Sequence, residues 1–185
     1  MTRANLDGLL PLLEASASHD EALEPENESS PIRRPFVGPL VISYVVEEGD
    51  LGRAFERGEL AATGADEKQL HERALANLAR HVKTVGIRLR PHGSMMAVSF
   101  DGDLEATLML YPTLWTHLRD EFADELVVAV PARDVLVVSP VDSPQGIAEL
   151  RAVVARVWPR DDHPLATELF QLDRERWSVW EAPAA

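Results

Sequence analysis

The chain has 185 residues, of which 45% are hydrophobic and 26% charged, enough for one globular domain with a well-formed core. It has no cysteine, which excludes disulfides, thiolate nucleophiles and thiolate metal sites. The net charge of −13 disfavours nucleic acid and anionic membranes as partners, because binding either begins with Lys and Arg neutralising negative charge. No uncharged apolar run approaches the ~18 residues of a membrane-spanning helix, so we expect a soluble, cytoplasmic protein.

Residues 1–36 differ in composition from the rest and are predicted to be a flexible acidic leader before a single domain over residues 37–185. From Glu14 to Pro35 the chain is rich in Glu, Ser, Ala and Pro, a composition that cannot offset its own ordering entropy. Leucines before this stretch share one helical face: Leu6, Leu9, Leu10 and Leu13. Two alternatives stay open for residues 4–15, a short amphipathic helix containing an awkward Pro11, or disorder in every state.

The domain is predicted to open with a strand and a long helix. Residues 40–46 are dense in β-branched side chains, which favours a strand. A helix is predicted from about Asp66 to Thr84, after a capping sequence and along an apolar stripe. Asn77 is unfavourable inside a helix, so we expect it to hydrogen-bond a neighbouring strand or loop, and His71 to be a half-buried structural histidine.

Two hairpins are predicted next. Apolar residues alternate on both sides of Asp101-Gly102, a favoured two-residue turn, and a short strand around Leu89 precedes this hairpin. A helix beginning at Pro112 separates it from a second hairpin, in which two continuous apolar runs, residues 126–130 and 135–138, flank four turn residues. Continuous hydrophobicity means that helices or another sheet must cover both faces of these strands.

The end of the chain completes the predicted fold. Ser143-Pro144 is typical of a helix start, and residues 165–172 and 176–181 are predicted as short strands that place Trp177 and Trp180 on opposite faces. We therefore predict an α+β fold, mainly antiparallel sheet with packed helices. Its central order is helix, three strands, helix, two strands, helix.

Several short motifs occur in an order that resembles the YtpQ-like family of uncharacterised bacterial proteins. They are Ala74-Leu75-Ala76-Asn77-Leu78, Asp103-Leu104-Glu105-Ala106-Thr107-Leu108-Met109-Leu110, Trp115 and Pro131-Ala132-Arg133-Asp134. The resemblance covers roughly residues 40–170 and implies a bacterial protein, but it carries over no catalytic residue.

The element order from Asp66 to Trp158 is also similar to that of the small acidic type III secretion chaperones and their relatives. This resemblance implies an acidic, often dimeric domain that binds extended or helical segments of other proteins without chemistry. The first strand and the tryptophan-bearing tail fall outside that pattern.

Three acidic residues at alternate positions form a candidate metal site. Asp101, Asp103 and Glu105 would share one face of a strand beginning at Asp101, and hard divalent cations such as Mg²⁺ or Ca²⁺ require oxygen ligands of this kind. In this alternative the protein is a divalent-metal-dependent hydrolase or nuclease, with Asp134 or His92 helping to activate water. The alternative, non-functional interpretation is that acidic residues beside an Asp-Gly turn are ordinary solvated residues.

The remaining candidates favour binding. Arg133 and Asp134 occupy a hairpin tip, where they either hold the loop or anchor a partner, and Trp177 and Trp180 are further partner-binding candidates. No glycine-rich phosphate loop and no nucleophile elbow occurs in the sequence, so no cofactor is expected. We predict a non-catalytic, chaperone-like or adaptor module that binds a protein or peptide, with a basic segment favoured by charge, and that forms a homodimer. A further alternative is an antitoxin-like inhibitor of a basic effector.

Overall fold

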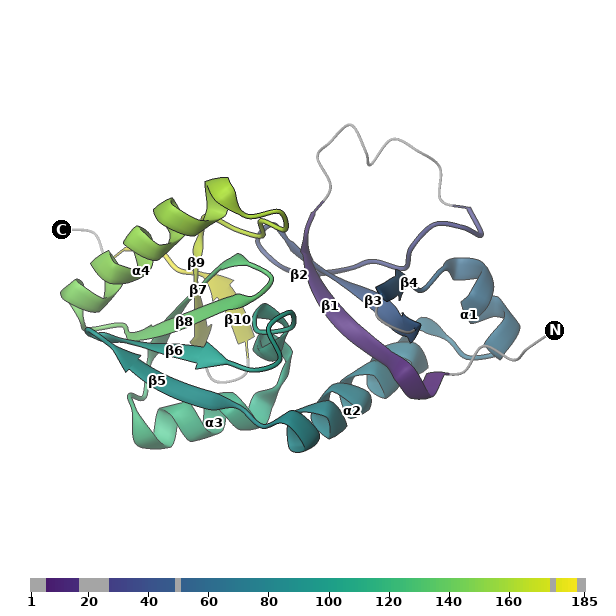
Figure 1. The fold of residues 1–185 in the computed structure, drawn as a ribbon, viewed down its shortest axis with the longest axis horizontal. Coiled ribbons are helices and arrows are strands. Elements are labelled where there is room, and N and C mark those ends of the chain that lie inside the picture. The colour runs from purple at the N-terminus through teal and green to yellow at the C-terminus, as the bar shows by residue number, and fades with distance from the viewer. Residues whose placement is uncertain (1–5, 17–26, 49–50, 174–175, 183–185) are drawn as a thin grey trace.

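The computed structural model describes residues 6–16, 27–48, 51–173 and 176–182 and arranges them around two antiparallel sheets (Figure 1). In the four-stranded sheet, β3 (Leu40–Glu48) is central and pairs with β1 (Leu9–Ala15) along one side. β2 (Arg34–Val37) and β4 (Leu51–Ala54) pair with opposite ends of the other side of β3. The strand predicted over residues 40–46 is thus confirmed.

The larger sheet has six strands in the spatial order β10-β9-β7-β8-β6-β5. Every pair of neighbours is antiparallel. Its strands are β5 (Arg88–His92), β6 (Met95–Ser99), β7 (Leu126–Ala132), β8 (Val135–Pro140), β9 (Leu169–Asp173) and β10 (Arg176–Val179). The chain therefore has the predicted α+β fold.

Helices lie on both sides of this sheet, with α4 along one face and α3 on the other, while α2 runs below the junction with the smaller sheet (Figure 1). The α-helices are α1 (Arg57–Thr63), α2 (Glu67–Val85), α3 (Pro112–Glu121) and α4 (Pro144–Val157). Short 3₁₀ helices are η1 (Leu6–Gly8), η3 (Ala106–Leu110) and η4 (Trp158–Arg160). None of the described helices combines the length and apolar composition needed to cross a membrane.

The hairpin β7–β8 is covered on both faces, as its continuous hydrophobicity predicts. Val127 and Ala129 pack with α4, whereas Val128 and Val130 face the main core, which continues into the four-stranded sheet. All of β7 is buried. The main core therefore draws on both sheets, and a second cluster lies between the six-stranded sheet and α4.

The predicted flexible leader is wrong for the segment that forms β1. Residues 9–13 are buried and pair with β3, from Leu9 opposite Val46 to Ala15 opposite Leu40. The apolar run is a strand buried on both faces rather than an amphipathic helix or a disordered tail. Residues 27–36 are also placed, with Ile32 in the core, while residues 1–5 and 17–26 lie outside the described residues.

A side chain of α2 closes part of the outer edge of β1. Asn77 Nδ2 donates to the carbonyl oxygens of Leu6 and Leu9, each at 2.8 Å, and the residue is only 4% exposed. The expectation that Asn77 bonds a neighbouring segment is confirmed. The Asn77 side chain, in the middle of α2, donates to two backbone carbonyl groups that no neighbouring strand pairs with.

The same edge explains the proline in β1. The Leu13 N–H donates to Thr107 Oγ1 at 3.1 Å, so its backbone N–H points away from β3. Pro11 lies two residues earlier and therefore faces the same way, because successive residues of a strand alternate. A proline there leaves no N–H unpaired, whereas in a helix it would break the ladder.

The predicted central order contains three strands before the second helix, and the prediction of the third strand is wrong. Residues 106–110 form the 3₁₀ helix η3 instead. Side-chain carboxylates take the backbone donors that a hairpin would have used. Glu105 Oε1 accepts from the N–H groups of Phe100 at 2.8 Å and Gly102 at 2.9 Å. Asp101 Oδ1 accepts from Asp103 at 3.1 Å and Leu104 at 2.8 Å. The hairpin in this region is instead β5–β6, with its turn at Gly93-Ser94.

Substitution Asn77→Ala should lower the free energy of unfolding by roughly 2–4 kcal/mol, because it leaves two buried carbonyl groups without a donor. Urea denaturation followed by circular dichroism measures this change. Lys83→Ala, at an exposed position of the same helix, is the matched control and should change stability by less than about 0.5 kcal/mol. Equal effects of the two substitutions would contradict the edge-closing role of Asn77.

Candidate functional site

Glu105 is the one carboxylate of the predicted acidic set that lies in the interior. It is 4% exposed, and burial raises its pKa, against the opposing effect of the backbone N–H groups of Phe100 and Gly102. Its Oε2 is buried without a hydrogen-bond partner among the described residues. The side chain holds the loop after β6 at the expense of desolvating an acid.

The other two acids of the set serve different contacts. Asp101 Oδ2 lies 2.9 Å from His81 Nε2, and the Asp103 side chain is 71% exposed. No three His, Asp or Glu side chains among the described residues are grouped so that they could hold a metal ion. The geometry therefore gives no support to the metal-dependent hydrolase alternative, and His92 lies in a different pocket from these acids.

The turn containing Arg133 and Asp134 meets this acidic loop. Arg133 Nη1 lies 3.7 Å from Asp103 Oδ1, and the Arg133 carbonyl accepts from the Ala106 N–H at 3.0 Å. The Arg133 N–H donates to the His163 carbonyl at 3.3 Å, while Asp134 is exposed. These contacts hold the turn against two loops, and they give Arg133 a structural role.

A buried tyrosine and a half-buried histidine pair beneath the smaller sheet. Tyr44 Oη and His71 Nδ1 are 2.9 Å apart. Burial raises the pKa of Tyr44 to about 12, and burial together with the charge of Arg34 lowers the pKa of His71. Both directions favour a neutral imidazole that accepts a hydrogen bond from the tyrosine hydroxyl. His71 is thus half-buried and hydrogen-bonded, as predicted.

A groove of about 420 Å³ lies between α3 and the β9–β10 hairpin. Its lining combines apolar side chains with the polar Thr116 and Arg119, and it includes one of the predicted partner-binding residues, Trp177. The lining residues are Met109, Pro112, Trp115, Thr116, Arg119, Leu172 and Trp177. Trp115 is 3% exposed and Met109 is 2% exposed, so the apolar surface that a ligand can reach comes mainly from Trp177 and Pro112.

Hydrogen bonds fix the two indoles of the groove. Trp115 Nε1 donates to the Leu108 carbonyl at 3.0 Å, and Trp177 Nε1 donates to the Met109 carbonyl at 3.2 Å. The rings meet edge to face with centroids 4.8 Å apart. Both polar tips are therefore satisfied inside the protein. The half-buried Trp177 ring lines the groove, and the buried Trp115 ring supports it from beneath.

A second hollow of about 610 Å³ continues the groove past the end of α3. The two hollows share the lining residues Arg119 and Leu172. These two residues are also hydrogen-bonded, because Arg119 Nη2 donates to the Leu172 carbonyl at 2.9 Å. Acidic side chains line the second hollow: Asp124, Glu125 and Asp173. The composite groove is therefore apolar at one end and acidic at the other.

The predicted partner-binding residues do not form one site. Trp177 lines the groove, whereas Trp180 packs on the α4 side, with its ring 5.7 Å from the guanidinium carbon of Arg151. This confirms the opposite faces predicted for the two tryptophans. Arg133 and Asp134 lie at the β7–β8 turn. Sequence reasoning did not assign Met109, Arg119 and Asp173 to a site, because they are far apart in the sequence and come together only through tertiary packing.

Comparison of the chain with protein-family models, with curated proteins and with solved structures finds no match. The resemblance to the YtpQ-like family therefore stays a prediction. The function has to be argued from the described surface alone.

Substitution Glu105→Gln should change how stability depends on pH. The folded state binds the Glu105 proton more tightly than the unfolded state does, because burial raises the pKa of this carboxyl. The wild-type protein therefore loses stability as the pH rises from the ordinary glutamate pKa, 4.5, to the raised pKa. Glutamine keeps the Oε1 acceptor and has no such loss. The difference in unfolding free energy between Glu105→Gln and wild type should therefore grow in favour of the variant across this interval.

Urea denaturation at a series of pH values measures that difference. Asp103→Asn, at the exposed end of the same loop, is the matched control and should follow the wild-type pH profile. Parallel profiles for Glu105→Gln and wild type would contradict a buried carboxyl with a raised pKa.

Proposed function

We propose that this protein is a non-catalytic binding module of the chaperone-like or adaptor kind, and that the groove between α3 and the β9–β10 hairpin receives a segment of another protein. The observation that carries the proposal is the pairing of an apolar end, whose accessible surface comes from Pro112 and Trp177, with an acidic end. The expected ligand is a segment in which a large apolar side chain is followed by Lys or Arg.

The apolar end has the features of a binding hot spot. Trp177 is half-buried and packs edge to face on the buried Trp115, so a ligand side chain would contact a ring that the core holds in place. Tryptophan is enriched among the residues that dominate binding energy at protein interfaces. An apolar side chain of the partner would displace water from this surface without requiring the protein to rearrange.

The acidic end selects the charge of the ligand. Asp124 and Glu125 at the end of α3 and Asp173 at the end of β9 are all exposed, while Arg119 is the single basic residue of the described lining. The excess of negative charge favours a basic group, as does the net charge of −13 over the whole chain. A second copy of this acidic chain suits the groove less well than a basic partner, although the expected homodimer does not depend on this surface.

Fluorescein-labelled peptides containing Leu-Phe-Lys-Lys, Leu-Phe-Glu-Glu or Gly-Gly-Lys-Lys test the proposal by anisotropy titration. The Leu-Phe-Lys-Lys peptide should bind at least about tenfold more tightly than either of the others, because only it matches both ends of the groove. Its affinity should fall as salt rises. Equal binding of all three peptides would contradict the proposed groove.

Two variants locate the peptide. Thr116→Arg, at an exposed position on the groove wall, should weaken binding of the Leu-Phe-Lys-Lys peptide about tenfold by occupying the apolar end without removing a core contact. Asp173→Asn should weaken the same peptide and leave the Leu-Phe-Glu-Glu peptide unaffected or improved. Asp134→Asn, an exposed acid at the β7–β8 turn, is the matched control and should bind as wild type.

Light scattering on the same samples reports the oligomeric state. A dimer that Thr116→Arg dissociates would place a second copy of the chain in the groove and overturn the proposed ligand. Loss of peptide binding in Asp134→Asn but not in Asp173→Asn would move the site to the β7–β8 turn.

A further inference from the structure

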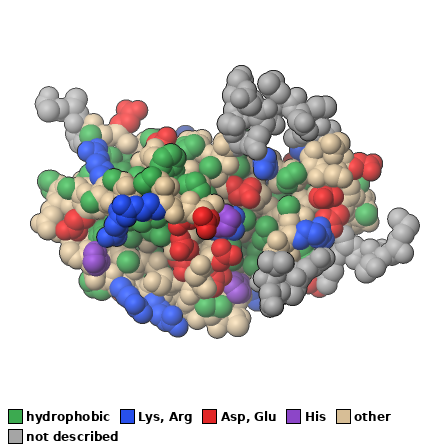
Figure 2. Space-filling model, turned by 45° about the horizontal axis from the view of Figure 1, so that its top comes forward, with side chains coloured by type: hydrophobic (Ala, Val, Ile, Leu, Met, Phe, Trp, Pro, Cys, Tyr) green, Lys and Arg blue, Asp and Glu red, His purple; other side chains and the backbone are tan. Residues whose placement is uncertain are grey.

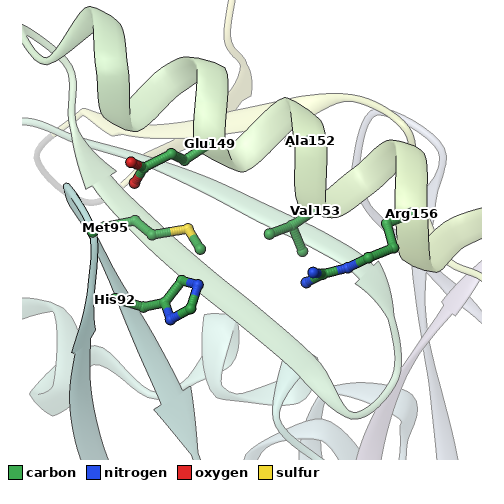
Figure 3. Close-up of a pocket in the computed structure, with 7 residues that line it drawn as sticks. His92, Met95, Glu149, Ala152, Val153 and Arg156 are labelled. Carbon is green, nitrogen blue, oxygen red and sulfur yellow. The ribbon is translucent and has the colours of Figure 1, made fainter.

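A second pocket, separate from the groove, lies between α4 and the β5–β6 hairpin (Figure 3). It has a volume of about 200 Å³ and shares no lining residue with the groove. Met95, Ala152 and Val153 form its apolar part, and the side chains of His92 and Arg156 extend into it from β5 and α4 (Figure 3).

A carboxylate of α4 fixes the shape of this pocket. Glu149 Oε2 accepts from the Ser94 N–H at 2.7 Å, and Glu149 Oε1 accepts from Gln145 Nε2 at 3.0 Å. Gly93 has a φ of +61°, and a Cβ there would lie only 2.7 Å from both Glu149 oxygens. Glycine is therefore required at this turn. The hydrogen bond from Ser94 to Glu149 holds the turn against α4, the helix that also carries Arg156.

The two basic side chains of the pocket form no ion pair with the described residues. Arg156 and His92 are exposed, and neither has an ion-pair partner within the part of the chain that the structure describes. Other arginines do pair with acids, as Arg53 does with Glu59. Lys and Arg side chains gather over α4 and the neighbouring end of the sheet, away from the acidic side chains nearer the middle of this face (Figure 2).

We propose that this pocket binds a carboxylate group, held between the Arg156 guanidinium and the His92 imidazole with its carbon chain against Met95 and Val153. An arginine fork matches the two oxygens of a carboxylate, and a neutral or protonated imidazole can donate to either one. Glu149 lies at the same end of the pocket as His92, opposite Arg156 (Figure 3), and its charge disfavours a doubly charged phosphate, so a single negative charge fits best.

A volume of about 200 Å³ limits the ligand to a small group. Since each liquid water occupies ≈ 30 Å³, the space admits a short carboxylic acid or the terminal residue of a peptide. The carboxylate comes either from a free small acid or from the C-terminus of another chain, and the apolar floor serves both.

Two-dimensional amide NMR of the full chain at constant ionic strength tests this site with three probes: sodium acetate, an acetylated tetra-alanine with a free C-terminus, and the same peptide as its C-terminal amide. Saturable shifts around Gly93, Ser94 and Ala152 are expected with acetate and with the free-acid peptide, and none with the amide. Tighter binding of the free-acid peptide than of acetate assigns the site to chain ends, whereas equal binding assigns it to small acids.

Variants distinguish the site from general charge attraction. Arg156→Gln should weaken acetate binding by about tenfold or more, since it removes the charge-assisted pair. Arg160→Gln, which removes an exposed arginine of η4 outside the pocket, is the matched control and should bind as wild type. Shifts that the amide produces as strongly as the acid, that fail to saturate, or that survive Arg156→Gln would overturn the proposal.

Discussion

Four consecutive residues of η3 are each bonded to a different part of the chain, and the arrangement of the whole molecule depends on this segment. The Ala106 N–H donates to the β7–β8 turn, and the Thr107 hydroxyl accepts from β1. The Leu108 carbonyl accepts from the indole of α3, and the Met109 carbonyl accepts from the indole that β10 carries. A short 3₁₀ helix, whose own hydrogen bonds are few, is thereby held from four directions.

This set of bonds links the fold to the proposed binding surface. The indoles of Trp115 and Trp177 satisfy two backbone carbonyls with their polar tips. The half-buried Trp177 ring lines the groove and packs edge to face on the buried Trp115 ring. Phe36 extends the cluster, since its ring lies 6.5 Å from that of Trp177 and connects the groove to the four-stranded sheet. The floor of the groove is consequently part of the core, and its shape is set before any ligand arrives.

Charge is distributed unevenly over this strongly acidic molecule. The groove beside α3 ends in Asp124, Glu125 and Asp173, while the pocket beside α4 holds Arg156 and His92 on the other side of the six-stranded sheet. The edge of β5 carries Arg88 and Arg90 as well, and Pro91 in the same strand cannot donate to an added strand. Binding through side-chain pockets is therefore better supported here than extension of the sheet at β5.

The sequence by itself determined the elements whose stabilising contacts are local or repeat along the chain. The apolar runs of residues 126–138 specified a doubly covered hairpin, and the caps at Asp66 and Ser143 specified the starts of α2 and α4. Tertiary structure alone decided β1 and η3, because their backbone groups are satisfied by Asn77, Thr107 and the two indoles, up to 94 residues away. It also decided the site: no local pattern links Met109, Arg119 and Asp173, and only the packing of α3 against β9 and β10 brings them to one groove.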